Sequence, residues 1–406
     1  MSETRVRLRP FRAEHVGSLL RPESLKQKRL ALETANKSVN DIRGDAEMRK
    51  AEDEAIEQVV RLQQELGFRA VTDGEYRRRD FWGPIFYNLK GFEELHVRDP
   101  AELLRPYVPD SVCWTDKTLA SISGELLICT SKIEHVGSGV LTEWNTIKSL
   151  LSPDQVKDAK ISLPNPELFH LRYKKGRAYT KEAYTNDENY LNDIAQAYRT
   201  ELQILYDAGC RHVTIDDPNL AYFCSEIMIK GFKEAGEDID SLFDSYVRLY
   251  NGCIIRPADM HLAIHVCRGN ALSRHVSEGG YDPVSIKLFQ EINADTYYLE
   301  YDTERSGTFE PLEHLPGHKN VILGVISSKF PKLEELSELK AKVLDAATHM
   351  ARGAGQSLQE ALDRLSVSPQ CGFASSHLGN LITCDDMVAK LKLVRALADE
   401  LWPGEP

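Results

Sequence analysis

The sequence predicts an α/β fold in which eight parallel strands and their intervening helices form a single (β/α)8 TIM barrel. Two observations carry this prediction. Eight short β-rich segments are distributed along the chain, and helical patterns lie between most of them. In addition, "GFRAVTDGE" (67–75) and "GCRHVTIDD" (209–217) both follow a helical pattern and run from glycine through a β-rich stretch into acidic residues. A unit repeated in this way is typical of folds assembled from βα units.

The candidate strands are short, rich in β-branched and apolar residues, and end in polar or acidic loops. They are residues 13–18, 69–75, 159–166, 211–218, 261–269, 295–302, 320–329 and 365–372.

The clearest helix candidate is Asp45–Leu66, in which Ile56, Val59 and Val60 fall on one face and Gly67 provides a stop. Further helical patterns cover Asp187–Ala208, Pro283–Ile292, Leu333–Arg352, Leu358–Leu365 and Asp385–Trp402.

The long stretch 83–158 separates the second and third candidate strands. It contains the β-rich run "ELLICTSKIEHV" (125–136), so we expect a hairpin-containing insert beside the mouth of the barrel. No low-complexity segment or linker divides the chain. The sequence therefore predicts one catalytic barrel domain over 1–406, with an insert at about 83–158.

Composition excludes several classes of protein. A formal charge of −12 without a basic stripe argues against nucleic acid as a partner. No run of about 18 apolar residues is present, which argues against a membrane partner, and "MSETRVRLRP" lacks the apolar core of a secretory signal. Eight scattered cysteines indicate reduced thiols, so we expect a cytoplasmic protein. A homo-oligomer is compatible with this composition but not specified by it.

Four side chains that commonly bind metals fall at the ends of predicted strands. A strand through "AIHVCRGN" points His265 and Cys267 to the same side, and Glu300 and Cys371 end the sixth and eighth strands. Each alone has a structural explanation, as a core histidine, a buried thiol or a salt-bridged carboxylate. Together, an imidazole, two thiolates and a carboxylate predict a tetrahedral Zn²⁺ site.

The charge of that ligand set indicates its chemistry. Two thiolates and a carboxylate carry three negative charges against two positive charges on zinc, so the metal is a weak Lewis acid and a poor activator of water. A coordinated thiol still loses its proton. Lowering a thiol pKa from about 8.5 to below 7 requires only about 2 kcal/mol. The pattern therefore favours alkyl transfer to a small-molecule thiol over hydrolysis.

The chain resembles the cobalamin-independent methionine synthase family, specifically its C-terminal catalytic barrel and related single-barrel proteins. The motifs that carry the resemblance span nearly the whole chain: "FRAEHVGSLLRP", "VTDGEYRRRDFW", "TIDDPNLAY", "AIHVCRGN", "YYLEYD", "LGVISSKFPKLE" and "VSPQCG". The resemblance implies that His265, Cys267, Glu300 and Cys371 bind a catalytic zinc ion.

The resemblance also implies a homocysteine site built from Val16, Gly17, Ser18, Glu75 and Asp216. The residue types agree, because a hydroxyl, backbone N–H groups and carboxylates suit an α-amino acid head group. Structural hydrogen bonds at a barrel rim are the alternative for the two carboxylates.

Three further positions are candidate site residues. His15 and Arg21 flank the first turn and could contact an anionic ligand; a surface salt bridge is the alternative. Lys329 replaces the histidine that the family uses to protonate its leaving group. A lysine in that catalytic role needs a pKa well below its usual value of about 10.4. The alternative is that Lys329 pairs with Glu334.

The sequence does not specify the alkyl donor. The end of the third strand, "LPNP", lacks the tryptophan that longer synthases place near the pterin, and their N-terminal barrel has no counterpart here. The leading hypothesis is an enzyme resembling 5-methyltetrahydropteroyltriglutamate–homocysteine S-methyltransferase, with methyltetrahydrofolate or another carrier as donor. The alternatives are a zinc-dependent thiol transferase acting on an epoxide, whose single-barrel relatives share features of 327–334, and a non-catalytic zinc barrel.

Overall fold

The computed structural model describes residues 11–95, 100–111 and 126–405, and its centre is a parallel sheet of six strands in the order β3-β4-β5-β6-β7-β8. The strands are β3 (Lys160–Pro164), β4 (His212–Asp217), β5 (His261–Val266), β6 (Thr296–Glu300), β7 (Asn320–Ile326) and β8 (Leu365–Pro369). All residues of β3, β6, β7 and β8 are buried. Continuous burial is typical of parallel strands covered by helices.

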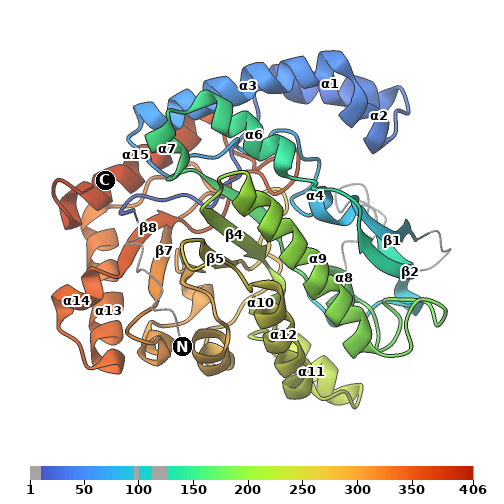
Figure 1. Ribbon diagram of the computed structural model, residues 1–406. Helices are drawn as coiled ribbons and strands as arrows, with labels where there is room; N and C mark the ends of the chain where they lie inside the picture. The colour runs from blue at the N-terminus through green and yellow to red at the C-terminus, as the bar shows by residue number, and fades with distance from the viewer. Residues whose placement is uncertain (1–10, 96–99, 112–125, 406) are drawn as a thin grey trace.

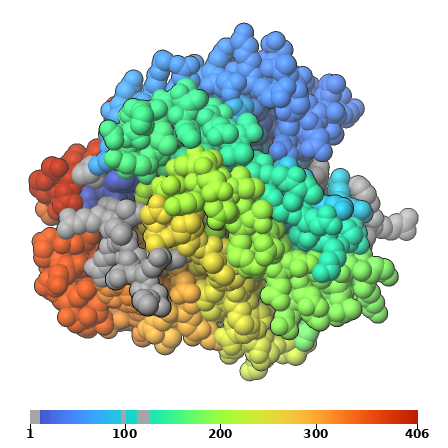
Figure 2. Space-filling view, in the orientation of Figure 1, coloured from blue at the N-terminus to red at the C-terminus, as the bar shows by residue number. Residues whose placement is uncertain are grey.

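Helices surround this sheet (Figure 1). They are α1 (Glu23–Thr34), α2 (Val39–Gly44), α3 (Ala46–Glu65), α4 (Gly83–Phe86), α6 (Leu141–Leu150), α7 (Pro153–Val156), α8 (Leu168–Arg172), α9 (Asp187–Asp207), α10 (Asn219–Tyr222), α11 (Glu226–Glu234), α12 (Ile239–Cys253), α13 (Leu336–Ala354), α14 (Leu358–Leu362) and α15 (Cys384–Leu401). Figure 2 shows the amino-terminal helices in blue along the top of one face and the C-terminal segment in red at its left edge. Within the described ranges, no helix combines the length and apolar character that crossing a membrane requires.

The last six predicted strands are confirmed, whereas 13–18 and 69–75 do not form regular strands. The first segment makes a single parallel bridge, between Ala13 and Val367 of β8. The second contributes the carbonyl of Val71, which accepts a hydrogen bond of 3.1 Å from the N–H of Lys160 in β3. The two segments therefore lie along the two outer strands of the sheet. Closure into a ring of eight stays a prediction.

Side chains explain why the second segment is irregular. Gln63 of α3 donates to the Thr72 carbonyl and accepts from the Thr72 N–H, both at 2.8 Å. The Thr72 hydroxyl in turn donates to the Gly17 carbonyl at 2.7 Å. Backbone groups that a strand would use for its ladder are thus satisfied by side chains, which removes the need for regular pairing.

The two long predicted helices are confirmed as α3 and α9. The Asp45 carboxylate accepts from the Met48 N–H and caps α3, and the Asn186 side chain accepts from the Asn189 N–H and caps α9. Two other helix predictions need correction. Leu358–Leu365 is helical only through α14, because Leu365 already begins β8.

The second correction concerns Pro283–Ile292, where the regular element is a short π-helical segment, Lys287–Glu291. The hydroxyl of Tyr297 on β6 donates to the carbonyls of Leu288, at 2.5 Å, and Ile292, at 3.3 Å. The neighbouring strand thereby supplies partners for carbonyls at both ends of this segment.

A separate antiparallel pair lies within the predicted insert. Strands β1 (Leu89–Glu94) and β2 (Leu127–His135) pair with each other, and β2 coincides with the predicted β-rich run, of which residue 125 lies outside the described residues. Figure 1 shows this pair apart from the six-stranded sheet. The parts of the insert at 96–99 and 112–125 also lie outside the described residues. The single-domain organisation stays a prediction.

Candidate metal centre and adjoining pocket

Four donor side chains meet where β5, β6 and β8 end. His265 is the last residue but one of β5 and Cys267 directly follows that strand, Glu300 is the last residue of β6, and Cys371 follows β8. One ligand atom from each residue lies within 4.8 Å of the others. All four side chains are buried, the most accessible being Cys267 at 6%. The structure thus brings together the four residues that the sequence indicated as metal ligands.

The donor set fits zinc. The two sulfur atoms lie 3.3 Å apart as free thiols, and the Gly269 N–H donates to the Cys267 Sγ at 3.1 Å. Sulfur, imidazole and carboxylate donors in one buried group match the ligands that zinc takes in proteins and do not match the all-oxygen sites of Mg²⁺ or Ca²⁺.

The imidazole of His265 is held from both sides. Its Nδ1 lies 3.2 Å from Asp216 Oδ1, and its Nε2 lies 3.2 Å from the carbonyl oxygen of Gln370. Burial alone would lower the pKa of His265, but the Asp216 hydrogen bond and the negative charges of Cys371 and Glu300 raise it to about 9. Asp216 can also fix the proton on Nδ1, so Nε2 would be the metal ligand once it no longer contacts the Gln370 carbonyl.

The thiols of Cys267 and Cys371 share one hydrogen bond, and this bond shifts their pKa values in opposite directions. The hydrogen bond with Cys267 lowers the pKa of Cys371 against the opposing effect of burial, with further lowering by His265 and Lys329. The same hydrogen bond, together with burial, raises the pKa of Cys267. The two shifts run in opposite directions, so the contact favours a single thiolate in the metal-free pair.

Glu300 is surrounded by positive charge. Its Oε2 lies 3.1 Å from Arg305 Nη2, and its Oε1 accepts from the Arg268 backbone N–H at 3.2 Å. Burial opposes ionisation, but the charges of Lys329, Arg268 and Arg305 together lower the pKa of this carboxyl below its ordinary value. Glu300 is thus an anionic donor at the back of the cluster.

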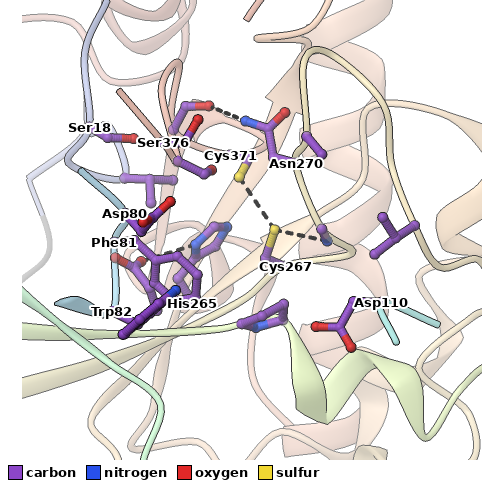
Figure 3. Close-up of a pocket in the computed structure, with 18 of the residues that line it drawn as sticks. Ser18, Asp80, Phe81, Trp82, Asp110, His265, Cys267, Asn270, Cys371 and Ser376 are labelled. Carbon is purple, nitrogen blue, oxygen red and sulfur yellow. Dashed lines mark hydrogen bonds and ion pairs between the residues drawn. The ribbon is translucent and has the colours of Figure 1, made fainter. Parts of the chain in front are cut away.

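A cavity of about 140 Å³ opens beside three of the four donor residues, His265, Cys267 and Cys371 (Figure 3). Glu300 does not line it. The remaining lining residues are Val16, Ser18, Glu75, Asp80, Phe81, Trp82, Asp110, Arg172, Asp216, Pro218, Tyr222, Gly269, Asn270, Ala271, Val276, Gly372, Ser375 and Ser376. A small molecule in this cavity would face the two sulfurs and the imidazole.

Four of the five residues assigned to the amino acid head group line the same cavity: Val16, Ser18, Glu75 and Asp216. Gly17 lies against this wall, because a Cβ there would come within 3.4 Å of Glu75 Oε1. Its φ of +152° also disfavours other residues.

The carboxylate of Glu75 is firmly held. Its Oε1 accepts from the Ser162 hydroxyl at 2.6 Å and lies 3.4 Å from Arg78 Nη1. Burial raises the pKa of Glu75, the charge of Arg78 opposes this shift, and the nearby Asp216 adds to it. The two carboxylates assigned to the ligand are therefore close enough to influence each other.

His15 and Arg21 do not line the cavity. The His15 ring packs edge-on against Phe68, with 5.4 Å between ring centroids, and burial holds its pKa well below the ordinary value. Arg21 Nη2 donates to the carbonyls of Glu75, at 2.6 Å, and Arg78, at 2.8 Å. Arg21 thus supports the loop that carries Glu75, and direct ligand contact by either residue stays a prediction.

Lys329 is buried close to the donor cluster but does not line the cavity. Its Nζ donates to Asn270 Oδ1 at 2.9 Å and to the Gly269 carbonyl at 3.1 Å. The alternative that Lys329 pairs with Glu334 is wrong, because Glu334 pairs with Lys390 at 2.9 Å. The proton-donor role stays a prediction.

Most of the other lining residues were not singled out from the sequence, among them Phe81, Trp82, Asp110, Arg172 and Tyr222. Phe81 and Trp82 belong to a motif that carried the family resemblance, so a signal was present. Asp110 and Arg172 form a buried pair, with 2.9 Å between Oδ2 and Nε, across 62 residues of sequence. No local pattern indicates such a pairing.

Comparison with known proteins supports the same family. The model of the cobalamin-independent synthase catalytic domain matches residues 179–399. The chain belongs to the cobalamin-independent synthase family. YxjG of Bacillus subtilis, an uncharacterized protein, is 32% identical over 396 residues, covering 97% of this chain and 95% of its own. Methionine synthase of Saccharolobus solfataricus is 25% identical over 389 residues, covering 95% and 94%.

A solved structure shows a similar arrangement along its whole length. The putative vitamin-B12-independent methionine synthase of Listeria monocytogenes superimposes with a TM-score of 0.70 at 27% identity, covering 98% of this chain and 99% of its own. The cobalamin-independent synthase fold is therefore shared across both chains. The name of the Bacillus relative specifies no reaction.

Proposed function

We propose that this protein is a zinc-dependent methyltransferase that transfers a methyl group to homocysteine and forms methionine. One observation carries the proposal: three residues of the donor cluster and four residues suited to an α-amino acid head group line the same cavity. A metal that only stabilised the fold would not need an adjoining cavity with these groups. The methionine synthase names of several relatives agree with this interpretation.

Different residues of the cavity would bind the ammonium group and the carboxylate of homocysteine. Glu75 and Asp216 would accept hydrogen bonds from its ammonium group, and the Ser18 hydroxyl with neighbouring backbone N–H groups would bind its carboxylate. Zinc, when held by the four donor residues, supplies the positive charge that favours the thiolate form of the substrate. Positioning sulfur and methyl donor together can contribute about 7–11 kcal/mol to lowering the barrier.

Aromatic side chains of the cavity form the proposed binding region for the methyl donor. Phe81, Trp82 and Tyr222 line the cavity together with the donor cluster, so an alkyl donor bound against them would face the thiolate. In Figure 3, Phe81 and Trp82 lie on the same side of Cys267 as His265. Methyltetrahydrofolate or another methyl carrier fits this part of the proposal.

Zinc-edge X-ray absorption with and without homocysteine tests the nucleophile. We expect the zinc-loaded protein to gain one sulfur ligand when homocysteine is added. If the ligands do not change, homocysteine is not the substrate that binds the metal. If the same four protein ligands remain whichever thiol is added, the site is structural. Methionine formation from homocysteine and a methyl carrier then tests the electrophile; a thioether formed only from an epoxide would favour the alternative transferase.

A further inference from the structure

Lys329 connects the loops that carry both cysteines. Its Nζ donates to the carbonyl of Gly269, whose own N–H donates to the Cys267 Sγ at 3.1 Å. Its second acceptor is Asn270 Oδ1, and Asn270 Nδ2 donates to the Gly372 carbonyl at 2.9 Å. Gly372 directly follows Cys371. One ammonium group therefore reaches the backbone beside each sulfur donor through short hydrogen-bonded paths.

The adjacent Ser328 strengthens the connection on the Cys371 side. Its hydroxyl donates to the Gly372 carbonyl at 3.0 Å, and its own carbonyl accepts from Asn380 Nδ2 at 2.9 Å. The loop after β7 is thereby fixed against the loop after β8. Lys329 is held in place from both directions and is only 2% exposed.

The four ligands carry one more negative charge than a zinc ion neutralises. Two thiolates and the Glu300 carboxylate carry three negative charges, and zinc supplies two positive ones. The nearest guanidinium is shared, because Arg305 Nη2 lies 3.1 Å from Glu300 and 2.6 Å from Asp302. The Arg268 guanidinium donates to neutral oxygens, among them the Gly279 carbonyl at 2.6 Å. The excess negative charge of the ligand set therefore has two buried cations nearby that contact only neutral oxygens among the described residues: Arg268, which lies on the Glu300 side, and Lys329, which lies beside the loops of the two cysteines.

Lys329 is a cation whose charge is not cancelled by direct contact. Both of its acceptors are neutral oxygens, and among the described residues it forms no ion pair. A buried ammonium without a carboxylate in contact is costly unless a nearby site carries compensating charge. The electron-rich donor cluster is such a site.

We propose that Lys329 is the positioning residue that balances the excess negative charge of the zinc centre and holds the two thiolate-bearing loops together. The inference rests on the zinc centre of the proposed function and adds a determinant of its metal affinity. It also explains a lysine that is buried beside the cluster without lining the cavity. The role requires no proton transfer from Lys329 to a substrate.

Zinc affinity of the full-length protein, measured with the metal alone against a chromophoric chelator, tests this role. Lys329→Gln keeps a hydrogen-bond donor but removes the charge, whereas Lys329→Arg keeps the charge. Lys319→Met is the matched control, since Lys319 is also a buried lysine but precedes β7, at the opposite end of that strand. Its Nζ donates to the Ile292 carbonyl.

We expect Lys329→Gln to weaken zinc binding by about 10–100-fold, the effect typical of residues that support metal ligands. Lys329→Arg should stay within about threefold of the wild type, and Lys319→Met should bind zinc normally. Wild-type affinity in Lys329→Gln would overturn the proposal, as would equal losses in the glutamine and arginine variants.

A spectroscopic measurement separates charge from a general loss of packing. With cobalt(II) in place of zinc, the sulfur-to-metal absorption band should move to lower energy in Lys329→Gln, because the thiolates become more electron-rich. The band should not move in Lys319→Met, and an unmoved band in a correctly loaded Lys329→Gln protein would contradict the charge role. Neither assay uses homocysteine or a methyl donor, so failure of the proposed reaction would leave this inference standing, and the reverse also holds.

Discussion

Asp216 Oδ1 lies 3.2 Å from Nδ1 of His265, and the two residues are register partners on the adjacent parallel strands β4 and β5. The contact is therefore set by the sheet itself. A carboxylate that accepts a hydrogen bond from the N–H of a metal-bound imidazole fixes the orientation of the ring and raises the basicity of the nitrogen that binds the metal. Asp216 also lines the cavity, so one side chain links the metal ligand to the substrate pocket.

Replacing the Asp216 carboxylate should lower zinc affinity more than it lowers the stability of the fold. We expect Asp216→Asn to lower zinc affinity by about 10–100-fold, because the amide is a weaker acceptor for the imidazole N–H. Chelator competition measures the change, and Asp217→Asn provides a neighbouring control whose carboxylate accepts from the Asn219 and Leu220 N–H groups. Unchanged zinc affinity in Asp216→Asn would show that the contact does not support the metal ligand.

The raised pKa of His265 makes metal-free stability depend on pH. A folded-state pKa of about 9, above the ordinary value of 6.5, means that the folded protein holds this proton more tightly than the unfolded chain. The resulting stabilisation is complete below about pH 6.5 and is lost as the pH rises through about 9. Over the same interval zinc should bind more tightly, because the metal requires the neutral imidazole.

Urea denaturation of the metal-free protein at pH 6.5 and pH 9.5 checks the sign. His265→Gln removes the titrating group, so the fall in unfolding free energy between the two pH values should be smaller in this variant than in the wild type. An equal fall in both proteins would mean that His265 does not cause the pH dependence.

The central sheet could be predicted from sequence because each of its strands combines an apolar run with a polar end. The donor cluster followed from the same pattern, since parallel strands bring their carboxyl ends to one edge and so place Glu300 and Cys371 near His265. The first two segments were harder to predict. In the second segment the backbone of Thr72 depends on the side chain of Gln63, which lies in a helix nine residues earlier.

Contacts between loops account for most of what the sequence did not indicate. Lys329 reaches Asn270 across 59 residues, and the conformation of both loops decides this contact. Composition and periodicity carry no information about such a distance. The family resemblance indicated the position of Lys329 and suggested a catalytic proton donor, which stays a prediction, but it did not indicate the two neutral oxygens that the buried side chain contacts.

Close packing at Gly372 should make its replacement destabilising. A Cβ at this position would lie 2.0 Å from the Ser18 Oγ, so the serine or its loop must move. We expect Gly372→Ala to cost about 1–3 kcal/mol in unfolding free energy, as overpacking typically does, and to weaken homocysteine binding. Gly44→Ala is the control, because a Cβ on Gly44 would have no neighbouring atom within 4 Å.

A double variant identifies the cause of that cost. Ser18→Ala removes the atom in closest conflict, so the cost of Gly372→Ala should be smaller in the Ser18→Ala background than in the wild type. Denaturant unfolding of the four proteins gives the coupling free energy. A coupling of zero would show that the Ser18 hydroxyl is not what excludes a larger residue at Gly372.

Removing one sulfur donor should abolish the metal and the activity together. Cys371 is buried against Cys267 within the donor cluster, and a serine hydroxyl is a much poorer zinc ligand than a thiolate. We expect purified Cys371→Ser to hold little zinc and to form no methionine, whereas Cys253→Ser, which changes a buried cysteine of α12 outside the cluster, should keep both. Metal content by mass spectrometry and turnover measured on the same preparations provide the comparison. Full turnover in a zinc-free Cys371→Ser protein would remove the metal from the reaction, since no other described group of histidine, cysteine and carboxylate side chains is placed to bind it in the same way.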